Sequence, residues 1–372
     1  MIKPVLLFLA VLCANLSASA EENYYSMDDF YRVPKADVHM HLHSTDPAFM
    51  QEAVKDRFRV LSINVDYADF PPIAEQQRVA EMLQKQYPAS LAFAATFSVQ
   101  GYDQPGWAEG VNRQLDQAVA HGAVAVKIWK NVGMELRAKD GSMVMIDDPH
   151  FKPVFDHLAQ IHIPLLGHQG EPKNCWLPLA EMTVKNDQEY FAQHPQYHMF
   201  LHPEFPSYED QMRARDSMLA HHPDLQFVGL HLASLEWSVT ELAGFLERFP
   251  QVMVDMAARI GQLQSQSIQD RERVRNFLIR YQDRLMYSTD LEQDPDPDQA
   301  QPCKTDCGTE LPFPEQARQV WLRDWRYFVT ADMISVPELD QPVQGLQLPR
   351  QVIDKLYNRN AARTFPGAWS AH

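Results

Sequence analysis

The sequence predicts an α/β protein whose parallel strands alternate with helices and close into a (β/α)8 TIM barrel. Eight apolar segments of strand length recur along the chain and carry few charges, as strands buried on both faces do. Segments with the apolar spacing of helices lie between them, and eight strands close such a barrel. The alternative is an open doubly wound sheet, but the Gly-rich phosphate loop expected after one of its strands is missing.

The strand segments are rich in Val, Ile, Leu and Phe. In chain order they are residues 36–40, 58–65, 91–97, 123–129, 163–167, 226–230, 252–256 and 285–288. The segments between and after them predict helices over residues 73–87, 107–121, 149–161, 208–222, 239–249, 271–281, 315–330 and 349–363. Two of these helices have recognisable starts. Asp148 before Pro149 combines a capping side chain with an N1 proline, and Ser207 with Asp210 has the spacing of a capping box.

Two connections on the C-terminal side of the strands are long. Residues 168–206 follow the fifth strand, and residues 290–314 follow the eighth. Barrel enzymes carry their specificity in loops on this side. Because no linker divides the chain, we expect a single barrel domain over residues 35–366.

The composition excludes several classes of protein. The 45% hydrophobic content of the 372 residues is enough for a large core, which excludes wholesale disorder. The 33 Lys and Arg are outnumbered by 49 Asp and Glu, and no run of basic residues occurs. Nucleic acid and anionic lipid are therefore poor candidates for partners.

Residues 1–20 have the pattern of a signal peptide. Lys3 precedes a short apolar run, and Ala18-Ser-Ala20 has the small residues of a cleavage site. The run is shorter than the roughly 20 residues of a membrane span. We therefore expect cleavage after Ala20, an N-terminal extension over residues 21–34, no stable membrane span, and export to the periplasm or the medium. The alternatives are an N-terminal anchor or a lipoprotein modified at Cys13, which the large Leu12 before it disfavours.

Export implies an oxidising compartment, which makes disulfides possible. Cys303 and Cys307 lie four residues apart in a Pro- and Asp-rich stretch, where a loop disulfide is favoured over a metal site. Cys175 is left without a predicted partner.

Four histidines and one aspartate follow the predicted strands at the same end of the barrel. His39 and His41 end the first strand with side chains on the same face. His168, His231 and Asp290 end the fifth, sixth and eighth strands. Imidazoles with a carboxylate and no thiolate suit Zn²⁺, Mn²⁺ or Fe²⁺ that holds a water. Each histidine alone is better explained as a core or surface residue, but five such groups at one end indicate a metal centre.

This pattern resembles the amidohydrolase superfamily of metal-dependent barrels. Finer features resemble its amidohydrolase-related branch, also called amidohydrolase family 2. They are Val126-Lys-Ile, Asp148-Pro149, Ile163-Pro-Leu-Leu-Gly-His168, Tyr287-Ser-Thr-Asp290 and Asn360-Ala-Ala-Arg. The resemblance covers about residues 35–366. It implies a distorted (β/α)8 barrel, a divalent metal, and hydrolysis or, in some relatives, non-oxidative decarboxylation.

The resemblance also implies roles for individual residues. His39, His41, His168 and Asp290 would hold the metal, with Asp290 also moving the proton. His231 would activate water, or bind a second metal. Lys127 would bridge two metals if carboxylated, or contact the substrate beside a single ion, which is the arrangement we favour. The alternative is a purely structural role, in which Lys127 is a charge-paired lysine at the barrel mouth.

Further residues are candidates for substrate contact. Glu171 lies in His168-Gln-Gly-Glu171, an order that resembles adenosine deaminases, although the segments around His231 and Asp290 do not match that family. Helix capping or substrate contact is therefore favoured for Glu171. Trp176 and Arg259 lie in the loops after the fifth and seventh strands and are also assigned to the substrate.

These observations predict an exported metal-dependent hydrolase, with zinc favoured over manganese or iron, that attacks an amide, lactone or similar bond of a small molecule. The first alternative is a metal-dependent decarboxylase of an aromatic or unsaturated acid. A deaminase-like hydrolase and a non-catalytic ligand-binding barrel are further alternatives. The sequence does not fix the substrate, the metal or the oligomeric state, and a homo-oligomer is one option.

Overall fold

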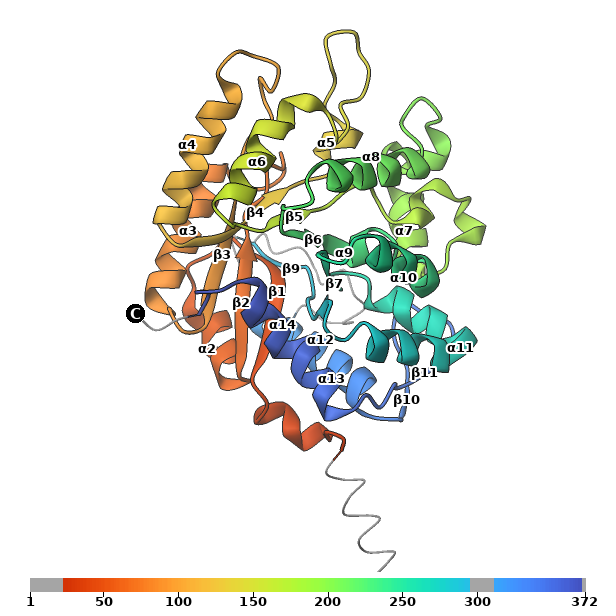
Figure 1. Ribbon diagram of the computed structural model, residues 1–372. Helices are drawn as coiled ribbons and strands as arrows, with labels where there is room; N and C mark the ends of the chain where they lie inside the picture. The colour runs from red at the N-terminus through yellow and green to blue at the C-terminus, as the bar shows by residue number, and fades with distance from the viewer. Residues whose placement is uncertain (1–22, 295–310, 370–372) are drawn as a thin grey trace, which may run out of the picture.

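A computed structural model describes residues 23–294 and 311–369 of the chain. Its main sheet has nine parallel strands in the order β8-β7-β6-β5-β4-β3-β2-β1-β9. Figure 1 shows the sheet curling on itself, with helices around the outside. The predicted distorted (β/α)8 barrel is confirmed. The predicted boundary of 35–366 lies close to the start of β1 and the end of the last helix.

The strands of this sheet are β1 (Lys35–Leu42), β2 (Phe58–Ile63), β3 (Leu91–Thr96), β4 (Ala123–Ile128), β5 (Leu165–Gly167), β6 (Phe227–Gly229), β7 (Met253–Asp255), β8 (Leu285–Met286) and β9 (Leu291–Gln293). A small antiparallel pair, β10 (Met333–Ile334) and β11 (Val343–Gln344), lies outside it. Seven of the first eight strands fall within the predicted segments, and β1 extends its segment by one residue at the start and two at the end. The sequence analysis did not predict β9.

The helices are α2 (Pro47–Lys55), α3 (Ile73–Gln86), α4 (Trp107–Ala120), α5 (Asn131–Met134), α6 (Lys152–Gln160), α7 (Lys185–Gln193), α8 (Tyr208–His221), α9 (Leu230–Ala233), α10 (Val239–Arg248), α11 (Ile260–Arg280), α12 (Phe313–Val329), α13 (Arg350–Asp354) and α14 (Asn360–Thr364). A π-helical turn, η8 (Lys355–Arg359), joins α13 to α14. Short 3-10 turns begin the described chain and fill much of the connection after β5. None of the described helices is long and apolar enough to cross a membrane.

The predicted helix starts are confirmed at two places. Ser207 accepts a hydrogen bond from the backbone of Asp210, whose side chain accepts one in return, so the capping box of α8 is complete. Asp148 accepts a hydrogen bond from the backbone of His150 at the turn that leads into α6.

The barrel closes between its first and last strands. The segment after β8 runs beside β1, where Val38 N donates to Tyr287 O at 3.2 Å and Asp290 N donates to His39 O at 2.8 Å. β9 then pairs with the end of β1. These bonds place Asp290 next to the His39–His41 strand.

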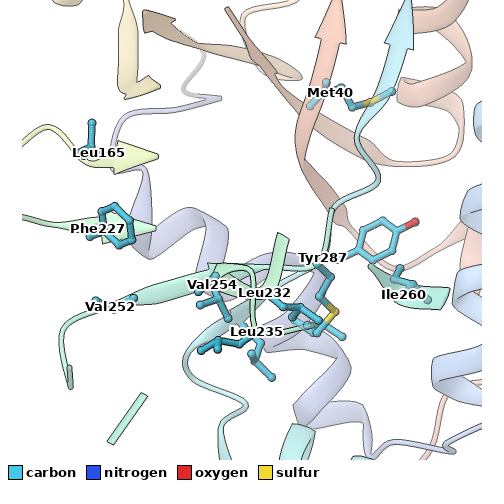
Figure 2. Close-up of a cluster of buried hydrophobic side chains, with 14 of the residues drawn as sticks. Met40, Leu165, Phe227, Leu232, Leu235, Val252, Val254, Ile260 and Tyr287 are labelled. Carbon is cyan, nitrogen blue, oxygen red and sulfur yellow. The ribbon is translucent and has the colours of Figure 1, made fainter. Parts of the chain in front are cut away.

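Two layers of apolar side chains hold these elements. Small residues on several strands, including Ala92, Ala94 and Ala125, form a cluster with Val38 and Leu166 that is distinct from the larger one beneath the helices. Figure 2 shows part of the larger cluster, which contains Leu165 of β5, Phe227 of β6 and Val254 of β7 as well as Leu232 and Leu235. The outer layer therefore continues under the segment that carries His231.

A change of face on β1 positions its histidines. Val38 packs in the smaller cluster, but Met40 packs in the larger one although strand alternation would place both on the same face. The pairing of β1 with β2 shifts register between Asp37 and Met40, as at a β-bulge. The shift lets His39 and His41 face the same interior as Val38.

Candidate active site

The five residues predicted to form the metal centre lie at one end of the barrel. His39 and His41 are in β1, and His168 and His231 follow β5 and β6. Asp290 lies between β8 and β9 with φ of 70°. The four histidines are buried, and the Asp290 side chain is 26% exposed. The strand order thus brings together residues that are up to 251 positions apart in the sequence.

Asp290 is the centre of the cluster. Its Oδ1 lies 3.1 Å from His39 Nε2 and 3.2 Å from His41 Nε2, and its Oδ2 lies 4.0 Å from His231 Nδ1. His39, His231 and Asp290 each offer a ligand atom within 4.8 Å of the others, so this group could hold a metal ion.

The hydrogen bonds of the two β1 histidines fit a cation at this point. His41 Nδ1 lies 2.7 Å from the carbonyl oxygen of Ile63, which only accepts hydrogen bonds, so Nδ1 carries the proton. His39 Nδ1 lies 2.8 Å from Asp255 Oδ2 and donates to that carboxylate in the same way. With Nδ1 as the donor in both rings, the Nε2 atom of each ring faces Asp290 Oδ1. At these distances, a lone pair on either nitrogen is repelled by the negatively charged Asp290 oxygen unless a cation lies between them.

The protonation states agree with this arrangement. Burial holds the pKa of His39 and His168 well below its usual value, and burial lowers the pKa of His231 to about 3. Burial alone would raise the pKa of Asp290, but His39, His231 and His41 together hold it well below its usual value. Burial therefore favours neutral rings at His39, His168 and His231 beside an ionised carboxylate at Asp290, and imidazole with carboxylate is a donor set of divalent metal sites.

His231 lies at a strained turn. Residues 231–234 all have φ between 56° and 57°, in the left-handed region that favours glycine. The backbone N–H of His231 donates to Asp255 Oδ1 at 2.6 Å. Tyr208 OH donates to Ser234 O at 2.5 Å, and Arg215 donates to Ala233 O, so side chains from α8 hold the turn.

His168 is held against His231. His168 Nδ1 lies 3.1 Å from His231 Nε2, and His231 Nδ1 lies 2.9 Å from the carbonyl of Ala257. His231 therefore carries its proton on Nδ1, and His168 Nδ1 donates to it. His168 Nε2 is buried and has no hydrogen-bond partner among the described residues, so its lone pair is available to a ligand. The set His39, His41, His168 and Asp290 stays a prediction, and the geometry also puts His231 within reach of the same ion.

Lys127 is buried near the end of β4, and its Nζ lies 3.5 Å from His39 Nε2. Burial lowers its pKa to about 8, against the opposing effect of Asp290 and Asp255. The side chain thus lies at the cluster, as predicted, and carboxylation of Lys127 stays a prediction.

Aromatic rings line the cluster on the side of β2 and β4. The Phe70 ring lies 5.1 Å from that of His41, and Tyr67 lies 5.2 Å from Phe70 and 4.4 Å from Trp129. Lys130, next to Trp129, forms an ion pair with Glu171. The structure therefore places Glu171 near the cluster rather than at a helix cap.

The structure places the other two predicted substrate residues, Arg259 and Trp176, in different surroundings. Arg259 is buried beside the cluster, where its charge lowers the pKa of His39, His168 and His231, after larger effects from burial. Trp176 donates through Nε1 to Pro206 O at 3.3 Å and packs on Tyr208. These contacts lie at the end of the connection after β5 and at the start of α8.

Three buried polar residues in the segments after β5 and β6 were not predicted. Gln169 follows His168 directly, Glu236 follows the His231 turn, and Asp187 comes from α7 in the connection after β5. All three are buried. Their position shortly after strand ends was the signal for Gln169 and Glu236, whereas nothing in the sequence marks Asp187.

A comparison with protein-family models supports these observations. Residues 36–367 match a family model described as Amidohydrolase. No curated protein sequence matches the chain.

Solved structures show the same fold. 2,6-Dihydroxybenzoate decarboxylase from Rhizobium has a TM-score of 0.51 and 12% sequence identity, with 90% of this chain and 98% of that chain covered. A structure of 2,6-dihydroxybenzoate decarboxylase with 2,6-dihydroxybenzoate has a TM-score of 0.50 and 12% identity, covering 90% and 99%.

Proposed function

Because the chain belongs to the amidohydrolase family, we propose that it is an exported, metal-dependent hydrolase that attacks a carbonyl centre of a small molecule. The bond would be an amide, a lactone or a similar C–N or C–O bond. The observation that carries the proposal is the position of Asp290 Oδ1, which is shared by the unprotonated nitrogens of His39 and His41. This arrangement suits a resident cation, and the cluster lies at the barrel end where such enzymes act.

His39, His41, His168 and Asp290 would hold one divalent ion, with zinc favoured over manganese or iron. A bound ion of this kind lowers the pKa of its water toward about 7 and provides hydroxide at neutral pH. Two ions would require Lys127 to be carboxylated and His231 to be a ligand. We favour one ion, because the Nδ1 and Nε2 atoms of His231 already face Ala257 O and His168 Nδ1.

The protein's own groups would move the proton. Asp290 is ionised and only partly buried, so it can accept a proton from the nucleophile and deliver it to the leaving group. His231, fixed through Ala257 and Asp255, would orient the water or polarise the carbonyl group under attack.

The substrate would lie between the aromatic side and the cationic side of the cluster. Lys127 and Arg259 would contact it from β4 and the loop after β7, and Glu171 would contact it together with its partner Lys130. Trp176 would support the loop after β5 through its bond to Pro206 and reach only a larger substrate.

Decarboxylation of an aromatic or unsaturated acid is the second candidate. The aromatic rings of Tyr67, Phe70 and Trp129 and the buried charges of Lys127 and Arg259 would suit a planar acid. Deamination is less favoured, because the Glu171 carboxylate is paired with Lys130 rather than free. A ligand-binding barrel without chemistry would have no need for the complete set around Asp290.

The experiment that tests the proposal is a panel of amides, lactones and aromatic acids assayed with the metal-loaded protein. Hydrolysis without CO₂ release supports the proposal, and CO₂ release with no net addition of water replaces it with decarboxylation. Stoichiometric metal without turnover on the whole panel would favour a ligand-binding barrel.

Export remains part of the proposal. Residues 1–20 and the Cys303–Cys307 pair lie outside the described residues. Intact mass of secreted protein should give a chain that begins at Glu21, and both cysteines should resist alkylation until they are reduced. A retained N-terminus or a lipid on Cys13 would contradict export by cleavage after Ala20.

A further inference from the structure

Asp37 is a buried acidic residue of β1, two residues before His39. It is fully buried and forms no ion pair among the described residues. Burying a carboxylate without a cation is unfavourable for folding unless hydrogen bonds satisfy its oxygens. The donors around Asp37 therefore show which parts of the chain this side chain connects.

Four hydrogen bonds converge on the Asp37 carboxylate. Thr289 donates twice, from Oγ1 to Oδ2 at 2.7 Å and from its backbone N–H to Oδ1 at 3.1 Å. Trp321 Nε1 of α12 donates to Oδ2 at 2.9 Å, and the backbone N–H of His39 donates to Oδ1 at 3.3 Å. Asp37 thus connects β1 to the segment between β8 and β9, which carries Asp290.

Asp290 directly follows Thr289 and has a strained backbone. Its φ of 70° lies in the left-handed region, which is unfavourable for a residue other than glycine. Such a conformation persists only where the surrounding contacts determine it. On one side of Asp290 these contacts are the two bonds from Thr289 to Asp37, and at Asp290 itself the backbone N–H donates to His39 O at 2.8 Å.

The hydroxyl group of Thr289 also acts on the residue after Asp290. Thr289 Oγ1 accepts the backbone N–H of Leu291 at 3.3 Å while it donates to Asp37. The carbonyl oxygen of Thr289 accepts the backbone N–H of Ala258, in the loop after β7, at 3.1 Å. A methyl group in place of this hydroxyl would remove both side-chain bonds and keep the shape of the residue.

We propose that Asp37 is a positioning residue for Asp290, which it holds in the left-handed conformation through both donors of Thr289. In that conformation the Asp290 carboxylate lies 3.1 Å from His39 Nε2 and 3.2 Å from His41 Nε2, where it would share the ion. Asp37 itself touches neither the ion nor the substrate. The proposal rests on the metal centre of the proposed function but not on whether the reaction is hydrolysis or decarboxylation.

The first readout is backbone hydrogen exchange in residues 287–293 of the mature protein, measured by mass spectrometry with and without Co²⁺. Thr289→Val should raise the exchange rate of this segment by about 10-fold, because it removes a hydrogen bond to a buried carboxylate. Thr289→Ser keeps the hydroxyl group and should restore most of the wild-type protection.

The second readout is the binding of Co²⁺, measured by competition with a chelator and by the visible absorption of the bound ion. Thr289→Val should weaken Co²⁺ binding by about 10-fold and change the absorption spectrum, because the Asp290 ligand is less well oriented. Asp37→Asn should have a larger effect, since its amide group presents N–H donors to a site that is already filled with donors. Thr289→Ser should stay close to wild type.

Tyr327→Phe is the matched control. It also removes one buried hydroxyl group, whose partner is Ser267 Oγ at 2.6 Å. We expect it to lower the melting temperature and to leave both the Co²⁺ dissociation constant and the absorption spectrum unchanged. A merely structural role for Asp37 would make Thr289→Val behave in the same way as this control.

Equal exchange and equal Co²⁺ dissociation constants in wild type and Thr289→Val therefore overturn the positioning role, also where Asp37→Asn does not fold. Weaker Co²⁺ binding in Thr289→Val with recovery in Thr289→Ser supports it. Failure of the proposed function is distinguishable, because it would appear as a wild-type protein that binds no Co²⁺. Exchange without metal would still decide whether Thr289 and Asp37 hold Asp290.

Discussion

Asp255 Oδ2 lies 2.8 Å from His39 Nδ1, and both side chains are fully buried. The other oxygen of Asp255 accepts the backbone N–H of His231. One carboxylate at the end of β7 therefore sets the tautomer of a β1 histidine and anchors the left-handed turn after β6. Carboxylates that receive a proton from a ligating imidazole orient the ring and raise its basicity as a metal ligand.

The first prediction follows from this contact. Asp255→Asn should lower metal affinity by about 10- to 100-fold, because the amide holds the His39 ring less firmly and supplies no charge. Metal titration followed by calorimetry measures the change. Asp332→Asn, at an exposed ion pair with Arg326, is the control. Equal metal affinity in Asp255→Asn and wild type would show that Asp255 has no role in orienting His39.

The second prediction concerns the proton carrier. Asp290→Asn keeps the shape and one oxygen donor but cannot carry a proton at neutral pH. We expect turnover to fall by about 10² to 10⁴-fold or more with metal resupplied, and metal content to fall less. Near-normal turnover at full metal loading would assign the proton to another group, with Glu171 as the next candidate.

The third prediction concerns the number of ions. His231→Asn should lower turnover and leave most of the metal bound, because His39, His41, His168 and Asp290 would still hold one ion. Elemental analysis of this variant and of the wild type gives the number of ions bound per chain. A change from two ions to one would contradict the single-ion arrangement and make carboxylated Lys127 the bridge.

The fourth prediction concerns stability and pH. Burial raises the pKa of Asp324 to about 6, against the opposing effects of Arg323 and a hydrogen bond from Tyr287. Since the folded state holds this proton more tightly, its contribution to stability is full below about pH 4 and is lost as pH rises through 6.

Asp324→Asn removes this titration and keeps an acceptor for Tyr287. Between pH 4 and 7, the free energy of unfolding should therefore fall less in the variant, by on the order of 2 kcal/mol. Urea unfolding at both pH values gives the difference. Parallel curves for wild type and variant would mean that Asp324 titrates normally in the folded protein.

The sequence predicted the strands best, because both faces of these strands are buried. The strands are continuous apolar runs because both of their faces are covered, and their ends placed four histidines and Asp290 correctly at one rim. The sequence carries no comparable signal for the pairing of strands where the barrel closes. β9 is a three-residue strand, Leu291–Gln293, whose partner β1 lies about 250 residues earlier in the chain.

The start of α11 was predicted wrongly. The sequence analysis began this helix at residue 271, but it begins at Ile260 and contains a kink at Asp270. Its first turns bury Gln262, Gln264 and Gln266 rather than an apolar stripe, so hydrophobic spacing could not reveal them. Two of these amides satisfy polar groups of neighbouring loops, because Gln262 donates to Asp187 and Gln266 accepts from the backbone N–H of Val239.

The site residues that the sequence missed share this origin. Asp187 and Glu236 became candidates through hydrogen bonds to residues that are distant in the sequence, Gln262 and Lys173. Trp176 shows the opposite case, since its position after β5 suggested a substrate contact and its indole instead bonds to Pro206.

The most direct test of the account is the metal content of the purified protein and of two variants, His39→Ala and His41→Ala, with the exposed His150→Ala as control. We expect about one divalent ion per chain in wild type and control, and substantial loss in both site variants with the fold retained. Metal content that is unchanged in His39→Ala and His41→Ala would contradict a metal centre at Asp290.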